Sequence, residues 1–215
     1  MPDTSGPTTT PAGPSAASYG VGARVSLYPM CDDYVDVILG ALADTPVPDG
    51  VTTATSPVST FAGGPEDTVV PWLADLVAAA TRRADGAHLA AAILLSRGCP
   101  GEVSCELASG PWASDDSVDV PGTGIEAWAD WSLYPLPDGA RAPGDHMEPI
   151  MAAVESARES GLYHSSDHYV TRLRGDVGAI LALVATAWLG TGSHVQHVVT
   201  HLTMSINSPT QGDPS

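Results

Sequence analysis

Hydrophobic and polar positions follow the same order of periods twice along this chain. Each copy opens with an alternating stretch typical of a strand and continues with apolar residues three and four positions apart, typical of an amphipathic helix. Two short β-branched runs, a second helical stretch and a final strand complete each copy. The pattern predicts strands at residues 25–30, 51–55, 58–62, 88–95, 128–136, 162–165, 169–173 and 197–207. It predicts helices at 34–42, 145–160 and 177–189, and one between Pro65 and Gly86 with Pro71 in its first turn.

Two short motifs show that the two copies are related. Ser26-Leu27-Tyr28-Pro29 recurs as Ser132-Leu133-Tyr134-Pro135, and each copy ends on Ser-x-x-x-Pro, at Ser96 and Ser205. The chain is therefore a tandem duplication. The order β-α-β-β-α-β predicts two ferredoxin-like repeats of the α+β class, with antiparallel sheets and helices on one face. The predicted boundaries are a disordered tail at 1–18, repeats at 19–107 and 124–209, a linker at 108–123 and a second disordered tail at 210–215.

The final strand of the second repeat indicates which face of the sheet is polar. Its even positions are apolar apart from Thr200, and they are Val198, Leu202, Met204 and Ile206. Its odd positions are His197, Val199, His201, Thr203, Ser205 and Asn207. We expect the apolar set to face the helices and the mostly polar set to form the opposite face. The corresponding face of the first repeat is richer in alanine, which favours two non-identical sites, or one site and one packing surface. The almost wholly apolar helix at 177–189 indicates packing beyond its own repeat.

Charge and composition exclude some partners. The net charge is −17, from 25 acidic and 8 basic residues, which argues against nucleic acid and anionic lipid as partners. The charge is compatible with a cationic ligand, and a soluble acidic surface explains it equally well. No run of about 18 apolar residues exists, so no membrane insertion is expected. The three cysteines favour a reduced cytosolic state, although Cys99 and Cys105 are spaced closely enough to pair.

Several segments together resemble a known family. They are Ser26 to Met30 with Asp32-Asp33, the loop Gly98-Cys99-Pro100-Gly101, the second Ser-Leu-Tyr-Pro, and the ending Ser205-x-Asn207-Ser208-Pro209. In this order, from Tyr19 to Pro209, they resemble the YkoF family, which is described as binding thiamine and hydroxymethylpyrimidine. The chain departs from that family in its first hairpin, where Ser56-Pro57 replaces an Asp-His turn. An Asp-His pair, Asp167-His168, is present in the second repeat instead.

The resemblance implies a cytoplasmic homodimer of tandem ferredoxin-like chains without catalytic activity. Its implied function is binding of thiamine or its hydroxymethylpyrimidine moiety, linked to uptake or salvage of thiamine precursors. A transporter component is then a further partner. No resident cofactor and no metal are expected. His197 and His201 share a strand face but lie about 13 Å apart, too far to chelate one ion together.

A site for an aminopyrimidine and a thiazolium calls for an aromatic or aliphatic slot and a few hydroxyl or amide partners, to which one carboxylate can be added. Tyr28 and Tyr134 fit the aromatic role, although a tyrosine that packs at the end of its strand is an equal alternative. The hydroxyls are also explained as satisfied strand side chains, and Asp32, Asp33 and Asp145 as helix caps. The predicted ligand-binding residues are Ser26, Tyr28, Met30, Thr53, Ser96, Gly98, Cys99, Ser132, Tyr134, Asp167, His168, His201, Thr203, Ser205 and Asn207.

Three functions remain open from the sequence. The first is non-catalytic ligand binding, with up to one site in each repeat. The second is a small cofactor-independent enzyme that acts on a thiamine or pyrimidine fragment, with acid–base groups among His197, His201, Asp167 and His168. The third is a ligand-sensing regulatory module.

Overall fold

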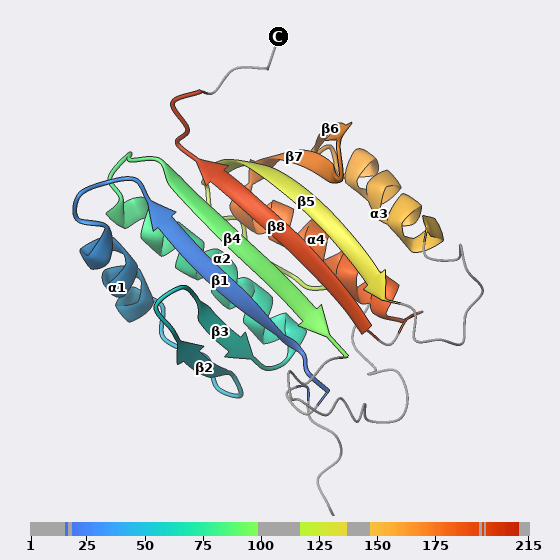
Figure 1. The fold of residues 1–215 in the computed structure, drawn as a ribbon, viewed down its shortest axis with the longest axis horizontal. Helices are drawn as coiled ribbons and strands as arrows, with labels where there is room; N and C mark the ends of the chain where they lie inside the picture. The colour runs from blue at the N-terminus through green and yellow to red at the C-terminus, as the bar shows by residue number, and fades with distance from the viewer. Residues whose placement is uncertain are drawn as a thin grey trace, which may run out of the picture.

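The computed structural model describes residues 16, 19–98, 117–136, 147–193, 195 and 197–210. The first repeat consists of β1 (Gly22–Pro29), α1 (Tyr34–Asp44), β2 (Thr52–Thr55), β3 (Thr60–Gly63), α2 (Glu66–Arg83) and β4 (Leu89–Arg97). The second consists of β5 (Glu126–Leu136), α3 (Met147–Glu159), β6 (Tyr163–Asp167), β7 (Val170–Asp176), α4 (Val177–Gly192) and β8 (His197–Ile206) (Figure 1). The predicted tandem of ferredoxin-like repeats is confirmed. Cys99, Cys105 and Asp145 lie outside the described residues.

The strands of both repeats form one eight-stranded antiparallel sheet in the order β2-β3-β1-β4-β8-β5-β7-β6. The last strands of the two repeats, β4 and β8, pair along nine residues, from Leu89 with Ile206 to Arg97 with Val198. Ile93 pairs with Leu202 at the centre, and each lies three residues before the repeated serine of its own repeat. The two repeats are therefore related by an approximate two-fold axis that passes through this pair.

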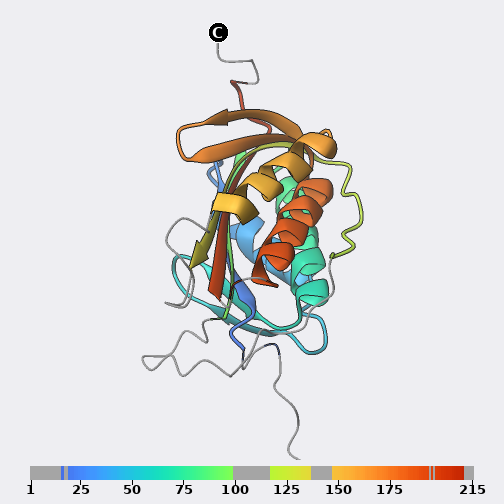
Figure 2. The same ribbon diagram turned by 90° about the vertical axis from the view of Figure 1, so that its right-hand side faces the viewer.

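The helices cover one face of the sheet and leave the other face open (Figure 2). Helix α2 of the first repeat packs against α4 of the second, so the core continues across the boundary between repeats. This contact accounts for the apolar character of α4, whose buried residues include Ile180, Leu181 and Val184. None of the helices in the described part of the chain has the length and apolar run needed to span a membrane.

The alternation predicted for β8 is confirmed. Val198, Leu202 and Met204 are buried on the helix side. Thr200 is also buried there, because its hydroxyl accepts a hydrogen bond from Trp131 Nε1 (2.7 Å) and donates one to the Ser132 carbonyl (2.9 Å). The exception in the sequence pattern is therefore a buried polar group with both of its partners, as burial requires.

Three local expectations differ from the structure. Helix α2 begins at Glu66, so Pro71 lies in the second turn and not in the first. Helix α4 continues through Gly190 to Gly192, because the end of the helix is packed at the buried Thr191 and Gly192 and these glycines do not end it. Asp167 belongs to β6, and the hairpin turn falls at His168 and Tyr169, where Tyr169 has a φ of 68°.

Asp176 joins the start of α4 to the segment before β5. Its carboxylate caps the helix by accepting from two α4 backbone N–H groups and also accepts from the preceding segment. The donors are the backbone N–H groups of Gly178, Ala179, Thr123, Gly124 and Ile125 and the Thr123 hydroxyl. Burial tends to raise the pKa of Asp176, but these hydrogen bonds outweigh burial and lower the pKa below its ordinary value of 3.8.

We predict that Asp176→Asn lowers the free energy of unfolding by about 1–2 kcal/mol near neutral pH, because the amide has no charge and only one acceptor oxygen, and its NH2 group cannot accept from the remaining donors. A lowered folded-state pKa gives stabilisation that is complete above the ordinary pKa of 3.8 and is lost as the pH falls through the folded value. Denaturant unfolding from about pH 6 to about pH 2 should therefore show the difference from wild type shrinking. Asp75→Asn, at an exposed position of α2, is the matched control. A difference that is constant with pH would contradict this account.

Candidate functional site

The open face of the sheet carries most of the predicted ligand-binding residues. Cross-strand register places Ser132 beside His201 and Tyr134 beside Val199 in the second repeat. In the first repeat the same register places Ser26 beside Ala92 and Tyr28 beside Ala90. Paired residues in an antiparallel sheet share a face, so the repeated serine and tyrosine lie beside His201 and Val199 in the second repeat and beside alanines in the first.

A hollow of about 480 Å³ lies on this open face in the second repeat. We call it the β5–β8 hollow, and its lining residues include Trp128, Asp130, Arg172, Thr203 and Ser205. Register pairs Trp128 with Ser205 and Asp130 with Thr203, so each β5 side chain has a hydroxyl beside it. The chain that follows β8 completes the lining at Ser208 and Thr210. The hollow therefore offers an aromatic ring, a carboxylate, a guanidinium and several hydroxyls.

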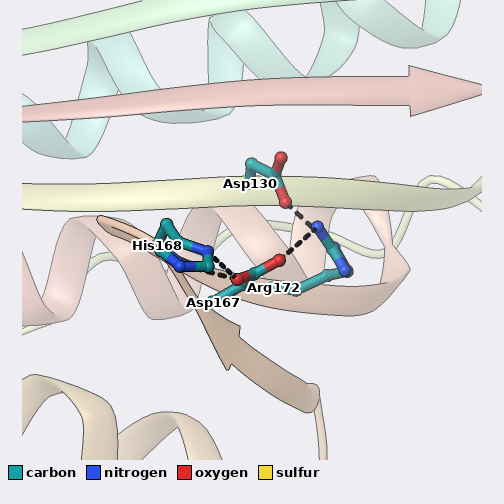
Figure 3. Close-up of polar contacts among 4 residues, drawn as sticks. All are labelled: Asp130, Asp167, His168 and Arg172. Atoms are coloured by element: carbon teal, nitrogen blue, oxygen red, sulfur yellow. Dashed lines mark hydrogen bonds and ion pairs between the residues drawn. The ribbon is translucent and has the colours of Figure 1, made fainter. Parts of the chain in front are cut away.

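Arg172 holds the charged side of this hollow together. Its Nε donates to Asp130 Oδ1 at 3.2 Å, and its Nη2 lies 3.9 Å from Asp167 Oδ2 (Figure 3). Arg172 is only 26% exposed, whereas the two carboxylates are about half exposed. A guanidinium between two carboxylates fixes the direction of both, and it partly neutralises an otherwise acidic edge.

Asp167 and His168 form a close pair beside Arg172. His168 Nδ1 lies 2.6 Å from Asp167 Oδ1, and the His168 backbone N–H donates to the same oxygen at 2.7 Å. The backbone bond is the largest cause of the lowered pKa of Asp167, followed by the histidine side chain. The His168 side chain is 91% exposed, so the pair stands in water at the rim of the sheet.

Trp128 is the aromatic surface of the β5–β8 hollow. The Arg174 guanidinium lies 5.2 Å from the centre of its ring, and the His164 ring meets it edge-on with centres 4.7 Å apart. These neighbours fix the position of the indole on the open face. Within the described residues, no group of three or more histidine, cysteine, aspartate or glutamate side chains is arranged to hold a metal ion.

A second hollow, of about 540 Å³, lies in the first repeat between β1, α1 and the β2–β3 turn. We call it the α1 hollow. Strand β3 pairs with β1 only as far as Val25 with Thr60, so the outer edge of β1 from Ser26 to Pro29 is open here. The lining combines serine and threonine hydroxyls with apolar groups such as Tyr28 and Leu39, and it includes no charged residue. The two hollows differ in position and in chemistry.

The remaining predicted residues are spread more widely. Thr53 pairs with Ala62, which pairs with the buried Ala23, so Thr53 lies on the helix side of the far edge strand. Met30 is 60% exposed at the end of β1. Gly98 and Asn207 end the last strands of the two repeats, both with positive φ, of 83° and 56°. Ser96 is on the open face of β4, and Cys99 lies outside the described residues.

The sequence reasoning missed Trp128, Asp130 and Arg172 as site residues. The available signal was the alternation of β5, which places Trp128 and Asp130 on the same face as the predicted Ser132. Arg172 has no comparable signal, because its contact with Asp130 joins strands 42 residues apart in the chain.

Comparison with known proteins agrees with the duplicated architecture. A family model described as the YKOF-related family matches residues 20–102 and 126–211, one match for each repeat. The chain is 29% identical over 192 residues to YkoF of Bacillus subtilis (strain 168), which has the provisional name of an HMP/thiamine-binding protein. That similarity covers 88% of this chain and 92% of the Bacillus protein.

Proposed function

Because the chain belongs to the YkoF-related family, we propose that it binds thiamine or its hydroxymethylpyrimidine moiety and does not catalyse a reaction. The name of the Bacillus relative supports a binding role for a thiamine-related compound. The observation that carries the proposal is the β5–β8 hollow, where Trp128, Asp130 and hydroxyls share one face.

The chemistry of the hollow suits an aminopyrimidine. The flat ring stacks on the Trp128 indole, its amino group donates to Asp130, and a ring nitrogen accepts from Thr203 or Ser205. Arg172 keeps the Asp130 carboxylate directed, and its two acidic partners leave it less available to repel a thiazolium cation. Hydroxymethylpyrimidine and thiamine share the aminopyrimidine, so in this proposal they compete for one site.

Binding is favoured over catalysis by the exposure of the carboxylate–imidazole pair beside the hollow. The His168 ring beside Asp167 is almost fully in water. General acid–base catalysis is most effective where water is excluded and the pKa of the base is tuned to its task. A rigid sheet face with directed polar groups is instead the arrangement of a binding site.

We predict that isothermal titration of the protein with hydroxymethylpyrimidine and with thiamine gives binding that is competitive between the two compounds. Trp128→Ala should weaken binding about tenfold or more, since it removes the stacking surface. Tyr169→Ala, at a 94% exposed aromatic outside the hollow, is the control and should bind as wild type does. Absence of heat for both compounds at millimolar concentration would sink the proposal. Equal affinities in wild type and Trp128→Ala would exclude this hollow as the site.

We also propose that the protein is a homodimer. Each repeat exposes apolar side chains at the end of its first strand and along its first helix, at 42–60% exposure. They are Tyr28, Met30, Tyr34 and Leu39 in the first repeat and Tyr134, Leu136, Met147 and Met151 in the second. Exposed apolar groups that gather in two equivalent places on one chain suit a symmetric contact with a second copy.

Sedimentation should therefore give about twice the chain mass of 22.0 kDa at micromolar concentration. Leu39→Glu should shift the protein toward monomer, because a carboxylate in an apolar contact is left without a partner. Val47→Glu is the control, an exposed aliphatic residue between α1 and β2. A wild type that sediments as a monomer at all concentrations would rule out this assembly.

The same proposal places the protein in the cytoplasm, beside a transporter of thiamine precursors. It rests on the family resemblance and on the ligand chemistry above. Affinity capture of the tagged full chain from detergent-solubilised membranes should recover a transporter component, and more of it when thiamine is present. Recovery of no membrane protein under either condition would contradict the transporter link and leave the ligand proposal untouched.

A further inference from the structure

A histidine and a serine recur with the same spacing in the last strand of each repeat. His88 lies eight residues before Ser96, and His197 lies eight residues before Ser205. The serines belong to the repeated Ser-x-x-x-Pro endings, so the histidines are equivalent as well. All four residues are partly buried.

The two-fold pairing of β4 with β8 brings the histidine of one repeat to the serine of the other. We call the paired length of β4 and β8 the seam. Ile93 pairs with Leu202 on the axis, and Ala90 pairs with Ser205 near one end of the seam. His88, two residues before Ala90, reaches Ser205, and its Nε2 lies 2.9 Å from the Ser205 hydroxyl. Ser205 lines the β5–β8 hollow, so a side chain of the first repeat acts on the proposed site of the second.

The segment that carries His88 is fixed from two sides. The Met30 backbone N–H donates to the His88 carbonyl at 2.8 Å, which ties it to the end of β1. The Asn207 amide donates to the Ala87 carbonyl at 3.5 Å, which ties it to the end of β8. The backbone at His88 is thus fixed, and it places the imidazole beside the Ser205 hydroxyl, which belongs to a paired strand of the sheet.

The equivalent pair has diverged. His197 and Ser96 are both described, and no hydrogen bond joins them. Ser96 also does not line the β5–β8 hollow. Of the two pairs that the duplication created, the one that is bonded is the one next to the hollow.

We propose that His88 is a positioning residue that sets the direction of the Ser205 hydroxyl, so that the ligand site is built by both repeats. The inference rests on the function proposed above. A neutral imidazole nitrogen either accepts from a hydroxyl or donates to it, and in each case it determines which side of the hydroxyl remains for a ligand. His88 thereby selects the donor or acceptor that Ser205 presents to an aminopyrimidine, and it does so without touching the ligand.

Titration calorimetry of the full chain with hydroxymethylpyrimidine tests this role. Loss of one neutral hydrogen bond in His88→Leu or in Ser205→Ala should weaken binding about fivefold. The double variant should be no weaker than Ser205→Ala, because His88 acts only through that hydroxyl. His88→Gln retains a hydrogen-bonding group and should recover most of the affinity, whereas a loss caused by packing would not be rescued. His197→Leu is the matched control and should bind as wild type does.

The outcomes separate the two proposals. If wild type and His88→Leu bind hydroxymethylpyrimidine equally well, the positioning role alone is overturned. It is also overturned if the losses of affinity in His88→Leu and Ser205→Ala multiply in the double variant. Wild type that binds neither compound overturns the function and this inference together. If His88→Leu does not fold, His88→Ala replaces it, and the comparison with His88→Gln and Ser205→Ala is unchanged.

Discussion

The pairing of β4 with β8 is the interaction on which the rest of the molecule depends. It converts two four-stranded sheets into one, and it brings α2 and α4 into contact on the helix side. At one end of the seam the fully buried Arg97 is paired with Glu66 at 3.7 Å. Burial lowers the pKa of Arg97, and the nearby carboxylate opposes that shift. Helix α4 passes so close to this arginine that a Cβ on Gly192 would lie 2.7 Å from Arg97 Cδ, so any other residue at this position would force the buried arginine to move.

The two repeats share one sheet and one layer of helices, but the open face differs in its residues between the first repeat and the second. On the open face, Ala90 and Ala92 of the first repeat stand where the two-fold axis places Val199 and His201 of the second. Asp130, with its partner Arg172, stands where the first repeat has Arg24, which bonds Ser59 instead. The two repeats thus share the scaffold on the helix side, whereas on the other face the paired carboxylate and guanidinium of Asp130 and Arg172 are found in the second repeat and the first has Arg24 bonded to a hydroxyl.

The parts of this fold that follow from local periodicity could be predicted from the sequence. The alternating and helical spacings along each copy were sufficient for the element order, and the alternation of β8 was sufficient to assign Val198, Leu202 and Met204 to the core. The start of α2 could not be placed, because Gly63, Gly64 and Pro65 suggest a longer break than the chain makes.

Contacts between distant strands account for what could not be predicted about the candidate site. Thr200 is an exception to the apolar pattern of β8, and the sequence does not explain it. The explanation is its hydrogen bond from Trp131, a residue of another strand. In the same way, the contacts of Arg172 with Asp130 and of His88 with Ser205 depend on the order of the strands in the sheet. The spacing of apolar residues along the chain does not predict that order. The side on which Thr53 lies could not be predicted for a different reason. All residues of β2 are exposed, so no alternation of polar and apolar residues distinguishes its two faces.

The free edge of β1 beyond β3 has a consequence for association between chains. An unpaired strand edge is a template for strands of other molecules, and long exposed edges lead to aggregation. The Met30 N–H points to β4, where it bonds His88, so the nitrogen of Pro29, one residue earlier, faces the open edge. Proline has no N–H to offer there. Pro135 stands at the equivalent place in β5, beyond the last pair of that strand with β7, Trp131 with Thr171. The proline of the repeated motif therefore removes one backbone donor from each of these edges, which makes both of them poorer templates for strands of other chains.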